Sequence, residues 1–222
     1  MRVLHDEVPD DDDFDAGRRR GEFDNITPDD LIHGADGNPP GWLDARDIER
    51  ARKQMPIVYV QVVPVQTDDL GRAVRIGTLL SIDETEEEGL TGVNIGGAEG
   101  VKRTIVSGRI LFHESIREAI ARNISKDLGE LALPQLPLAL QPFTIAQYFP
   151  TPGVSECYDP RQHAVALCYV VPIAGDCKPS DETLEVEWTR PEVVASTAFL
   201  QTLENGQAIV LKRALAWLGI EE

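Results

Sequence analysis

The segment between residues 115 and 128 carries apolar side chains at helical spacing. Steps of three and four residues place such side chains on one face of an α-helix. The apolar stripe consists of Ile116, Ala119, Ile120, Ile124 and Leu128. Ser115 and Glu118 match an S-x-x-E capping box at the start, and Gly129 is well placed to end the helix. The pattern therefore predicts a helix over about 115–128.

Runs of β-branched and apolar residues predict strands on both sides of this helix. The expected strands cover residues 57–66, 73–82, 104–112, 143–149, 163–173 and 183–188. Further helices are expected over 42–54, from Pro191 onward, and over 206–218. Because strands outnumber helices and one helix lies between central strands, this order of elements implies an α+β sandwich.

The N-terminal residues 1–40 have a different composition from the rest of the chain. They are rich in Asp, Gly and Pro, with four consecutive aspartates at 10–13. This composition predicts an acidic, solvated arm, because such a segment has few apolar side chains to bury. The remaining residues, 41–222, are expected to form one domain.

The charge of the chain limits its partners. The 222 residues have a net charge of −17, which repels nucleic acid and anionic membranes. Small anionic ligands remain compatible with this charge where basic residues gather locally. Three cysteines without a CxxC motif favour a reducing compartment. With no secretory signal or membrane span visible in the sequence, we expect a cytoplasmic protein.

The stretch from Gly108 to Gly129 reads GRILFHESIREAIARNISKDLG. It resembles the Nudix box, G-x5-E-x7-R-E-U-x-E-E-x-G-U, in which U is a bulky aliphatic residue. Gly108, Glu114, Arg122 and Gly129 fall in register with the box, and the likeness extends over roughly Pro56 to Gly219. More closely, the chain resembles an uncharacterised Nudix-like family with a diverged box. The resemblance implies a Nudix-like α/β/α sandwich with a mixed central sheet, and a homodimer.

The chain departs from the box at three positions that carry metal-binding glutamates in the family. Asn123, Lys126 and Asp127 occupy them, so only Asp127 keeps a negative charge. The three positions share one helix face, which presents zero net charge here instead of −3. An ammonium group about 4 Å from a unit positive charge costs roughly 4 kcal/mol at an effective dielectric near 20. Metal binding in the usual manner of the family is therefore disfavoured.

One hypothesis from the resemblance is a diverged metal-dependent hydrolase. Its substrates would be nucleoside diphosphates linked to another moiety, and its cofactor Mg²⁺ or Mn²⁺. Asp127, Glu114 and Glu182 would hold the metal, with Asp127, Glu114 and Arg122 as the catalytic group. Whether such a chain is an enzyme stays open at this stage, because Asn123 replaces a family ligand.

The alternative is a catalytically inactive Nudix-fold domain that needs no cofactor. It would bind a protein partner or a small anionic, nucleotide-like ligand, with Lys126, Arg109, Arg161 and His163 as the ligand-binding residues. These side chains also have structural interpretations. Lys126 and Arg122 could form ion pairs on the helix surface, and His163 could be satisfied at a strand end. A third reading is an assembly protein with an empty cleft.

Overall fold

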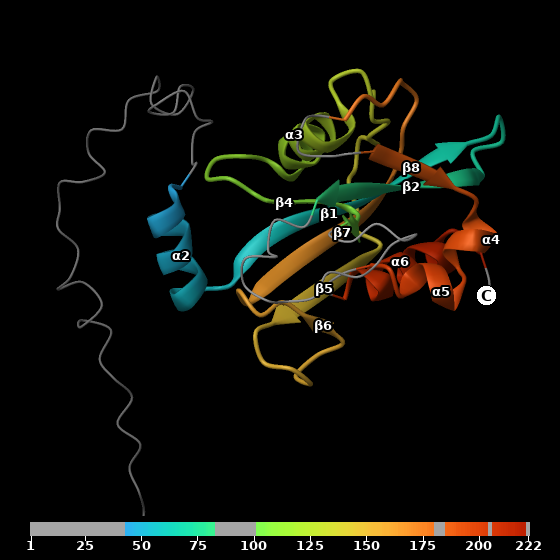
Figure 1. The fold of residues 1–222 in the computed structure, drawn as a ribbon. Helices are drawn as coiled ribbons and strands as arrows, with labels where there is room; N and C mark the ends of the chain where they lie inside the picture. The colour runs from blue at the N-terminus through green and yellow to red at the C-terminus, as the bar shows by residue number, and fades with distance from the viewer. Residues whose placement is uncertain (1–42, 83–100, 180–184, 204–205, 221–222) are drawn as a thin grey trace, which may run out of the picture. The chain divides into compact units, whose positions relative to one another are not determined.

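The structure is a computed structural model that describes residues 43–82, 101–179, 185–203 and 206–220 (Figure 1). Leu43–Glu222 form one compact unit. The expected acidic arm at 1–40 and the candidate metal ligand Glu182 lie outside the described residues. The division of the chain near residue 41 therefore stays a prediction.

A mixed β-sheet forms the centre of this unit. Its strands are β1 (Ile57–Thr67), β2 (Ala73–Ile82), β3 (Val101–Thr104), β4 (Val106–Arg109), β5 (Thr144–Phe149), β6 (Cys157–Tyr158), β7 (Ala164–Pro172) and β8 (Glu185–Thr189). The main order is β3-β2-β1-β7-β5-β6, with β4 paired to β1 and β8 paired to β2. β1 and β7 run parallel, with Ile57 opposite Ala164, whereas β2 and β4 pair with β1 in antiparallel fashion.

Helices cover both faces of the sheet (Figure 1). The described helices are α2 (Ala45–Gln54), α3 (Ile116–Leu128), α4 (Pro191–Val194), α5 (Thr197–Leu200) and α6 (Gln207–Trp217). The helix α3 packs on one face of the sheet, and α4, α5 and α6 pack on the other. The helix α2 precedes β1 and contains no buried residue. Asp44 caps it by accepting a hydrogen bond from the Asp47 N–H at 2.7 Å.

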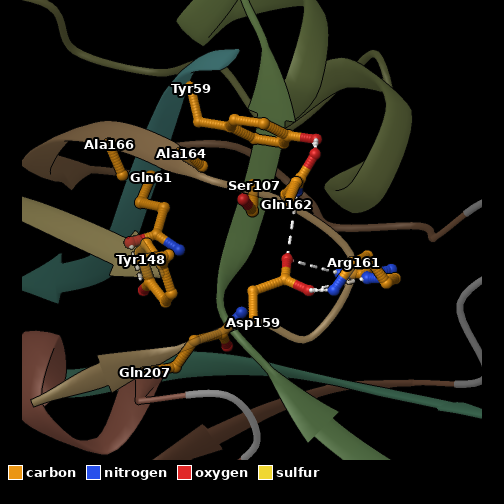
Figure 2. Close-up of a pocket in the computed structure, with 10 residues that line it drawn as sticks. All are labelled: Tyr59, Gln61, Ser107, Tyr148, Asp159, Arg161, Gln162, Ala164, Ala166 and Gln207. Carbon is orange, nitrogen blue, oxygen red and sulfur yellow. Dashed lines mark hydrogen bonds and ion pairs between the residues drawn. The ribbon is translucent and has the colours of Figure 1, made fainter. Parts of the chain in front are cut away.

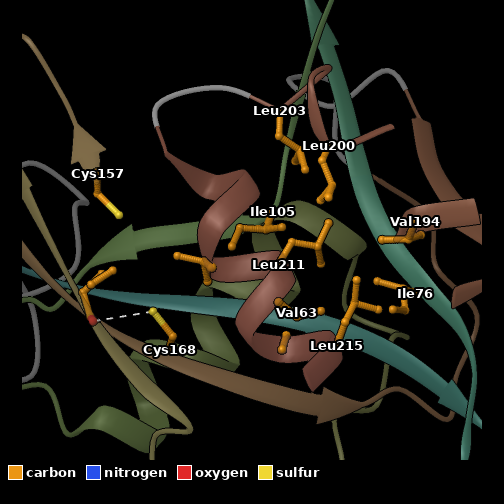
Figure 3. Close-up of a cluster of buried hydrophobic side chains, with 14 of the residues drawn as sticks. Val63, Ile76, Ile105, Cys157, Cys168, Val194, Leu200, Leu203, Leu211 and Leu215 are labelled. Carbon is orange, nitrogen blue, oxygen red and sulfur yellow. Dashed lines mark hydrogen bonds between the residues drawn. The ribbon is translucent and has the colours of Figure 1, made fainter. Parts of the chain in front are cut away.

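The side chains of β1 belong to two different hydrophobic cores. Val60 and Val62 pack with α3 in a cluster that includes Ile120. Val63 and Val65 pack on the opposite face with α6, in the cluster drawn in Figure 3. A strand that is buried on both faces reads as a nearly continuous apolar run. This explains why the sequence of β1 shows little alternation of polar and apolar residues.

The structure confirms the expected box helix and sandwich. The Ser115 hydroxyl accepts from the Glu118 N–H, and the Glu118 carboxylate accepts from the Ser115 N–H at 2.8 Å, which completes the capping box. Gly129 follows the helix with a φ of 94°, a value that glycine adopts readily. The sheet is mixed and has helices on both faces, as the resemblance implied.

The prediction of a single strand over residues 104–112 is wrong. The segment contributes to two strands instead, because β3 pairs with β2 while β4 pairs with β1. Between them, Ile105 is buried, and its N–H donates to Gln207 Oε1 at 2.8 Å instead of to a neighbouring strand. The chain changes its pairing partner at this point and leaves the sheet after Arg109. An apolar run alone does not reveal such a change of partner.

Candidate functional site

Two of the three diverged box positions face the protein interior. Asn123 and Asp127 are 2% and 9% exposed, whereas Lys126 is exposed. Asn123 Nδ2 donates to the Ala119 carbonyl at 2.8 Å. Its Oδ1 covers Gly108 so closely that an added Cβ on Gly108 would lie 1.8 Å away. The Asn123 amide therefore joins α3 to β4 and has little freedom to turn toward a ligand.

Glu114 and Arg122 form a partly buried ion pair that closes the connection between β4 and α3. Arg122 Nε lies 2.6 Å from Glu114 Oε1, and Arg122 Nη2 donates to Glu114 Oε2 and to the Arg109 carbonyl, both at 2.9 Å. The Leu111 N–H also donates to Glu114 at 2.9 Å. Burial alone would raise the pKa of Glu114, but the hydrogen bonds from Arg122 and Leu111 outweigh it and lower that pKa. These contacts support the interpretation that Arg122 and Glu114 form an ion pair that stabilises the fold.

We expect this ion pair to stabilise the fold in a pH-dependent way. A carboxyl with a lowered folded-state pKa adds stability above its unfolded pKa, about 4.3 for Glu, and loses it as the pH falls through the folded pKa. Glu114→Gln should therefore lower the free energy of unfolding by about 1–2 kcal/mol at pH 7 and by much less at pH 3. Urea unfolding of both proteins at the two pH values measures this. An unchanged difference between pH 7 and pH 3 would contradict the assignment, and the exposed Glu192→Gln is the control.

The box residues do not fit a divalent cation. Mg²⁺ prefers several oxygen ligands and usually takes a carboxylate or two from the protein. Among the three box positions only Asp127 is a carboxylate, Asn123 is fixed against β4, and Lys126 is a cation. Glu114 is already held by an arginine. In the described residues no three His, Cys, Asp or Glu side chains form a metal-binding group. Glu182, the third predicted metal ligand, lies outside the described residues.

A cavity of about 60 Å³ lies on the other face of the sheet, on the side of α6 (Figure 2). We call it the α6-side pocket. Its walls include Tyr59 and Gln61 of β1, Ser107 of β4, Tyr148 of β5, Ala166 of β7 and Gln207 of α6. The pocket is lined mainly by uncharged hydrogen-bonding groups, which suit a polar ligand.

A hydrogen-bonded network forms one side of this pocket. Asp159 accepts from Arg161 Nε at 2.9 Å and from Gln162 Nε2 at 3.0 Å. Arg52 of α2 donates to Gln162 Oε1 at 3.0 Å, which links that helix to the pocket. Burial raises the pKa of Asp159, but the hydrogen bonds from Arg161 and Gln162 outweigh it and lower that pKa. Asp159 is therefore an ionised anchor that fixes Arg161 and Gln162 at the pocket.

Three arginines line the α6-side pocket or are paired with its lining residues, in a chain that is strongly acidic overall. Tyr59 and Arg109 are paired across β1 and β4, so their side chains lie on the same face of the sheet. Arg161 lines the pocket, and Arg52 contacts the same network. Burial lowers the pKa of Arg109, and the charges of Arg122 and Arg52 act in the same direction. The guanidinium groups are thus near enough to influence one another.

The structure brings together only part of the predicted ligand-binding set. Arg161 lines the α6-side pocket, whereas Arg109 is not among the lining residues and is paired with Tyr59 on the same face of the sheet. Lys126 is exposed on α3, on the opposite face of the sheet. The His163 ring stacks on Phe149 with centroids 4.4 Å apart and does not line the pocket. The four residues therefore do not form one site.

Sequence analysis missed most of the pocket itself. Arg161 was a predicted ligand-binding residue, whereas Gln61, a polar residue inside the apolar run of β1, was a local signal that the prediction did not include. Arg52 lies in α2, just before β1, but its side chain contacts Gln162 in the loop before β7, and Gln207 lies at the start of α6. Their convergence depends on the sheet pairing, which local patterns do not contain.

Comparisons with known proteins give a family and a fold. Residues 38–220 match a family described as a domain of unknown function, DUF4916. A protein from Jonesia denitrificans, described as a possible asymmetric diadenosine tetraphosphate (Ap4A) hydrolase, is 43% identical over 76% of this chain and 99% of that one, with a TM-score of 0.68. A Nudix hydrolase from Nitrosomonas europaea is 13% identical over 73% of this chain and 90% of that one, with a TM-score of 0.50. No curated protein matches the chain. Among the described residues, no helix is long and apolar enough to cross a membrane.

Proposed function

The chain belongs to the DUF4916 family and has the Nudix fold, and we propose that it binds a small anionic, nucleotide-like ligand without metal. The ligand would occupy the α6-side pocket. The observation that carries this proposal is the placement of charge on the two faces of the sheet. The box face offers one carboxylate among the three metal positions, while Arg161 lines the pocket on the other face and Arg109 is paired with the pocket residue Tyr59.

Arginine is well suited to this role. Its guanidinium group stays charged and donates several hydrogen bonds in a plane that matches a phosphate. Arg161 is oriented by Asp159, so its position is fixed before a ligand arrives. The description of the Jonesia denitrificans relative favours a nucleotide as the source of the phosphate. A cytoplasmic location and a homodimeric state remain predictions from the sequence.

Calorimetric titration with ATP and with Ap4A tests the proposal. Binding is expected in EDTA and should not strengthen when Mg²⁺ is added. Arg109→Gln should weaken it about 10-fold or more, because a charge-assisted hydrogen bond contributes about 1.5–3 kcal/mol. Arg75→Gln, which removes an exposed arginine on β2, is the matched control. Binding that requires Mg²⁺, or that is equally strong in Arg109→Gln, would refute the proposal.

A second candidate function is a metal-dependent hydrolase of nucleoside diphosphates linked to another moiety. The description of the Jonesia denitrificans relative favours it, and Asp127 is the box carboxylate that remains. Chromatography of the same titration samples after incubation separates the two functions. Product that forms in Mg²⁺ but not in EDTA, and that is lost in Asp127→Asn, would establish the hydrolase.

A further inference from the structure

The side-chain amide of Gln61 has a defined orientation in the α6-side pocket. Gln61 is 4% exposed, and its Oε1 accepts from the Tyr148 hydroxyl at 3.0 Å. The Cys168 thiol approaches the same oxygen at 3.6 Å. Burial raises the pKa of Tyr148, so its phenol keeps its proton and is available as a donor. The Cys168 thiol also approaches the Ala166 carbonyl at 3.6 Å, so its single proton serves only one of the two oxygens. With the Tyr148 hydroxyl directed at Oε1, the NH₂ group of Gln61 is left for another partner.

Gln207 has the same arrangement at the start of α6. It is 9% exposed, and its Oε1 accepts from the Ile105 N–H at 2.8 Å. A backbone N–H can only donate, so this contact fixes which end of the amide is the oxygen. The NH₂ group of Gln207 must therefore lie on the other side of the amide. Figure 2 shows Gln61 and Gln207 among the residues around the pocket.

Neither NH₂ group has a hydrogen-bond partner in the part of the chain that the structure describes. Buried amides rarely stay in that condition, because an unsatisfied donor costs about 1–3 kcal/mol. Arg103 Nε is the one fully enclosed side-chain nitrogen or oxygen without a partner among the described residues, so the two amides open onto the cavity. The α6-side pocket thus contains two hydrogen-bond donors, the NH₂ groups of Gln61 and Gln207, on side chains that are at least nine-tenths buried. A ligand with hydrogen-bond acceptors could pair with both.

We infer that Gln61 and Gln207 select a ligand whose ring carries carbonyl oxygens. This inference rests on the proposed function and names the chemistry of the uncharged part of the ligand. Ala164 and Ala166 line the pocket together with Tyr59, and they have the smallest side chains of the lining residues. A carbonyl oxygen accepts from an amide NH₂, whereas a ring amino group at the same place sets donor against donor. Sites built in this way discriminate strongly, because the wrong ligand leaves buried groups unpaired.

Two pairs of nucleotides that differ at one ring substituent test this selectivity. IMP and UMP carry a carbonyl group where AMP and CMP carry an amino group, and the phosphate and ribose are the same. Calorimetric titration in EDTA should give about 10-fold or tighter binding of at least one carbonyl nucleotide over its amino partner. The ratio within each pair removes the contribution of the phosphate, which the arginines would bind equally.

Variants of the two glutamines connect the selectivity to the amides. Gln61→Met is neutral and similar in size, and it should reduce the preference to less than about 3-fold. Gln147→Met, at an exposed glutamine of β5, should keep it. Gln207→Glu retains the acceptor for the Ile105 N–H and replaces the NH₂ group by an oxygen, so it should shift the preference toward the amino nucleotides. This second variant gives an answer even if Gln61→Met fails to fold.

The outcomes distinguish this inference from the proposed function. Binding of all four nucleotides with equal affinity would overturn the amide selectivity and leave metal-independent binding intact. A carbonyl preference that appears only with Mg²⁺ would support the selectivity and overturn the metal-independent function. Absence of binding of any nucleotide, with and without Mg²⁺, would overturn both.

Discussion

Gly129→Ala is expected to lower the free energy of unfolding by about 3–5 kcal/mol, from backbone strain and overpacking together. Gly129 has a φ of 94°, a conformation that a residue with a Cβ adopts at a cost. The added Cβ would lie 2.2 Å from the Lys178 carbonyl oxygen. The Lys178 N–H donates to the Leu128 carbonyl at 2.8 Å, which holds the backbone of Lys178 against the end of α3. Urea unfolding measures the loss.

Gly71→Ala separates the two causes. Gly71 has a similar φ of 77°, but an added Cβ there would meet no atom within 4 Å. Strain alone should cost about 1 kcal/mol. Equal losses in the two variants would mean that the contact with Lys178 has no energetic weight. A larger loss in Gly129→Ala would show that the last glycine of the box is required by packing, independently of any chemistry.

The double substitution Asn123→Glu with Lys126→Glu is expected to create a metal site on the box face. It changes the charge of the face formed by residues 123, 126 and 127 from zero to −3. Each unit charge about 4 Å from a cation contributes roughly 4 kcal/mol per cation charge at an effective dielectric near 20. A gain of about 100-fold or more in Mn²⁺ affinity is therefore a conservative expectation.

Electron paramagnetic resonance of a Mn²⁺ titration measures this gain against the natural protein. Lys212→Glu is the control, because it makes the same charge change as Lys126→Glu on an exposed position of α6, on the opposite face of the sheet. If the double variant binds Mn²⁺ no better than the control, the carboxylates are not what the box face is missing. Tight Mn²⁺ binding by the natural protein would count against the metal-independent function.

Local features of the fold were predictable from the sequence. The box helix is specified within its own segment by Ser115, Glu118 and Gly129, so its limits follow from capping rules alone. The division of the 104–112 segment between β3 and β4 was not predictable. It depends on which partner each half finds, and those partners are β2 and β1. Pairing over long distances leaves no periodic signal in the segment itself.

The same contrast holds for the candidate site. Arg109 and Arg161 were candidates from the sequence because a guanidinium group can bind a phosphate. Gln61 and Gln207 carry no charge and match no motif, and their meaning depends on Tyr148 and Ile105 occupying their oxygens. The free NH₂ groups of these glutamines can be recognised only once the hydrogen-bond partners of their oxygens are known from the structure. The sequence therefore suggested Arg161 as a ligand-binding residue, but it indicated neither the pocket nor its uncharged interior.

The parallel pairing of β1 with β7 has a consequence for the kinetics of folding. Ile57 of β1 meets Ala164 of β7, roughly one hundred residues later, and pairings of such high contact order form slowly. Both strands contribute residues to the lining of the α6-side pocket. During synthesis, the pocket cannot exist until β7 has left the ribosome and docked. A ligand can thus stabilise the finished protein, but it cannot template the early steps of folding.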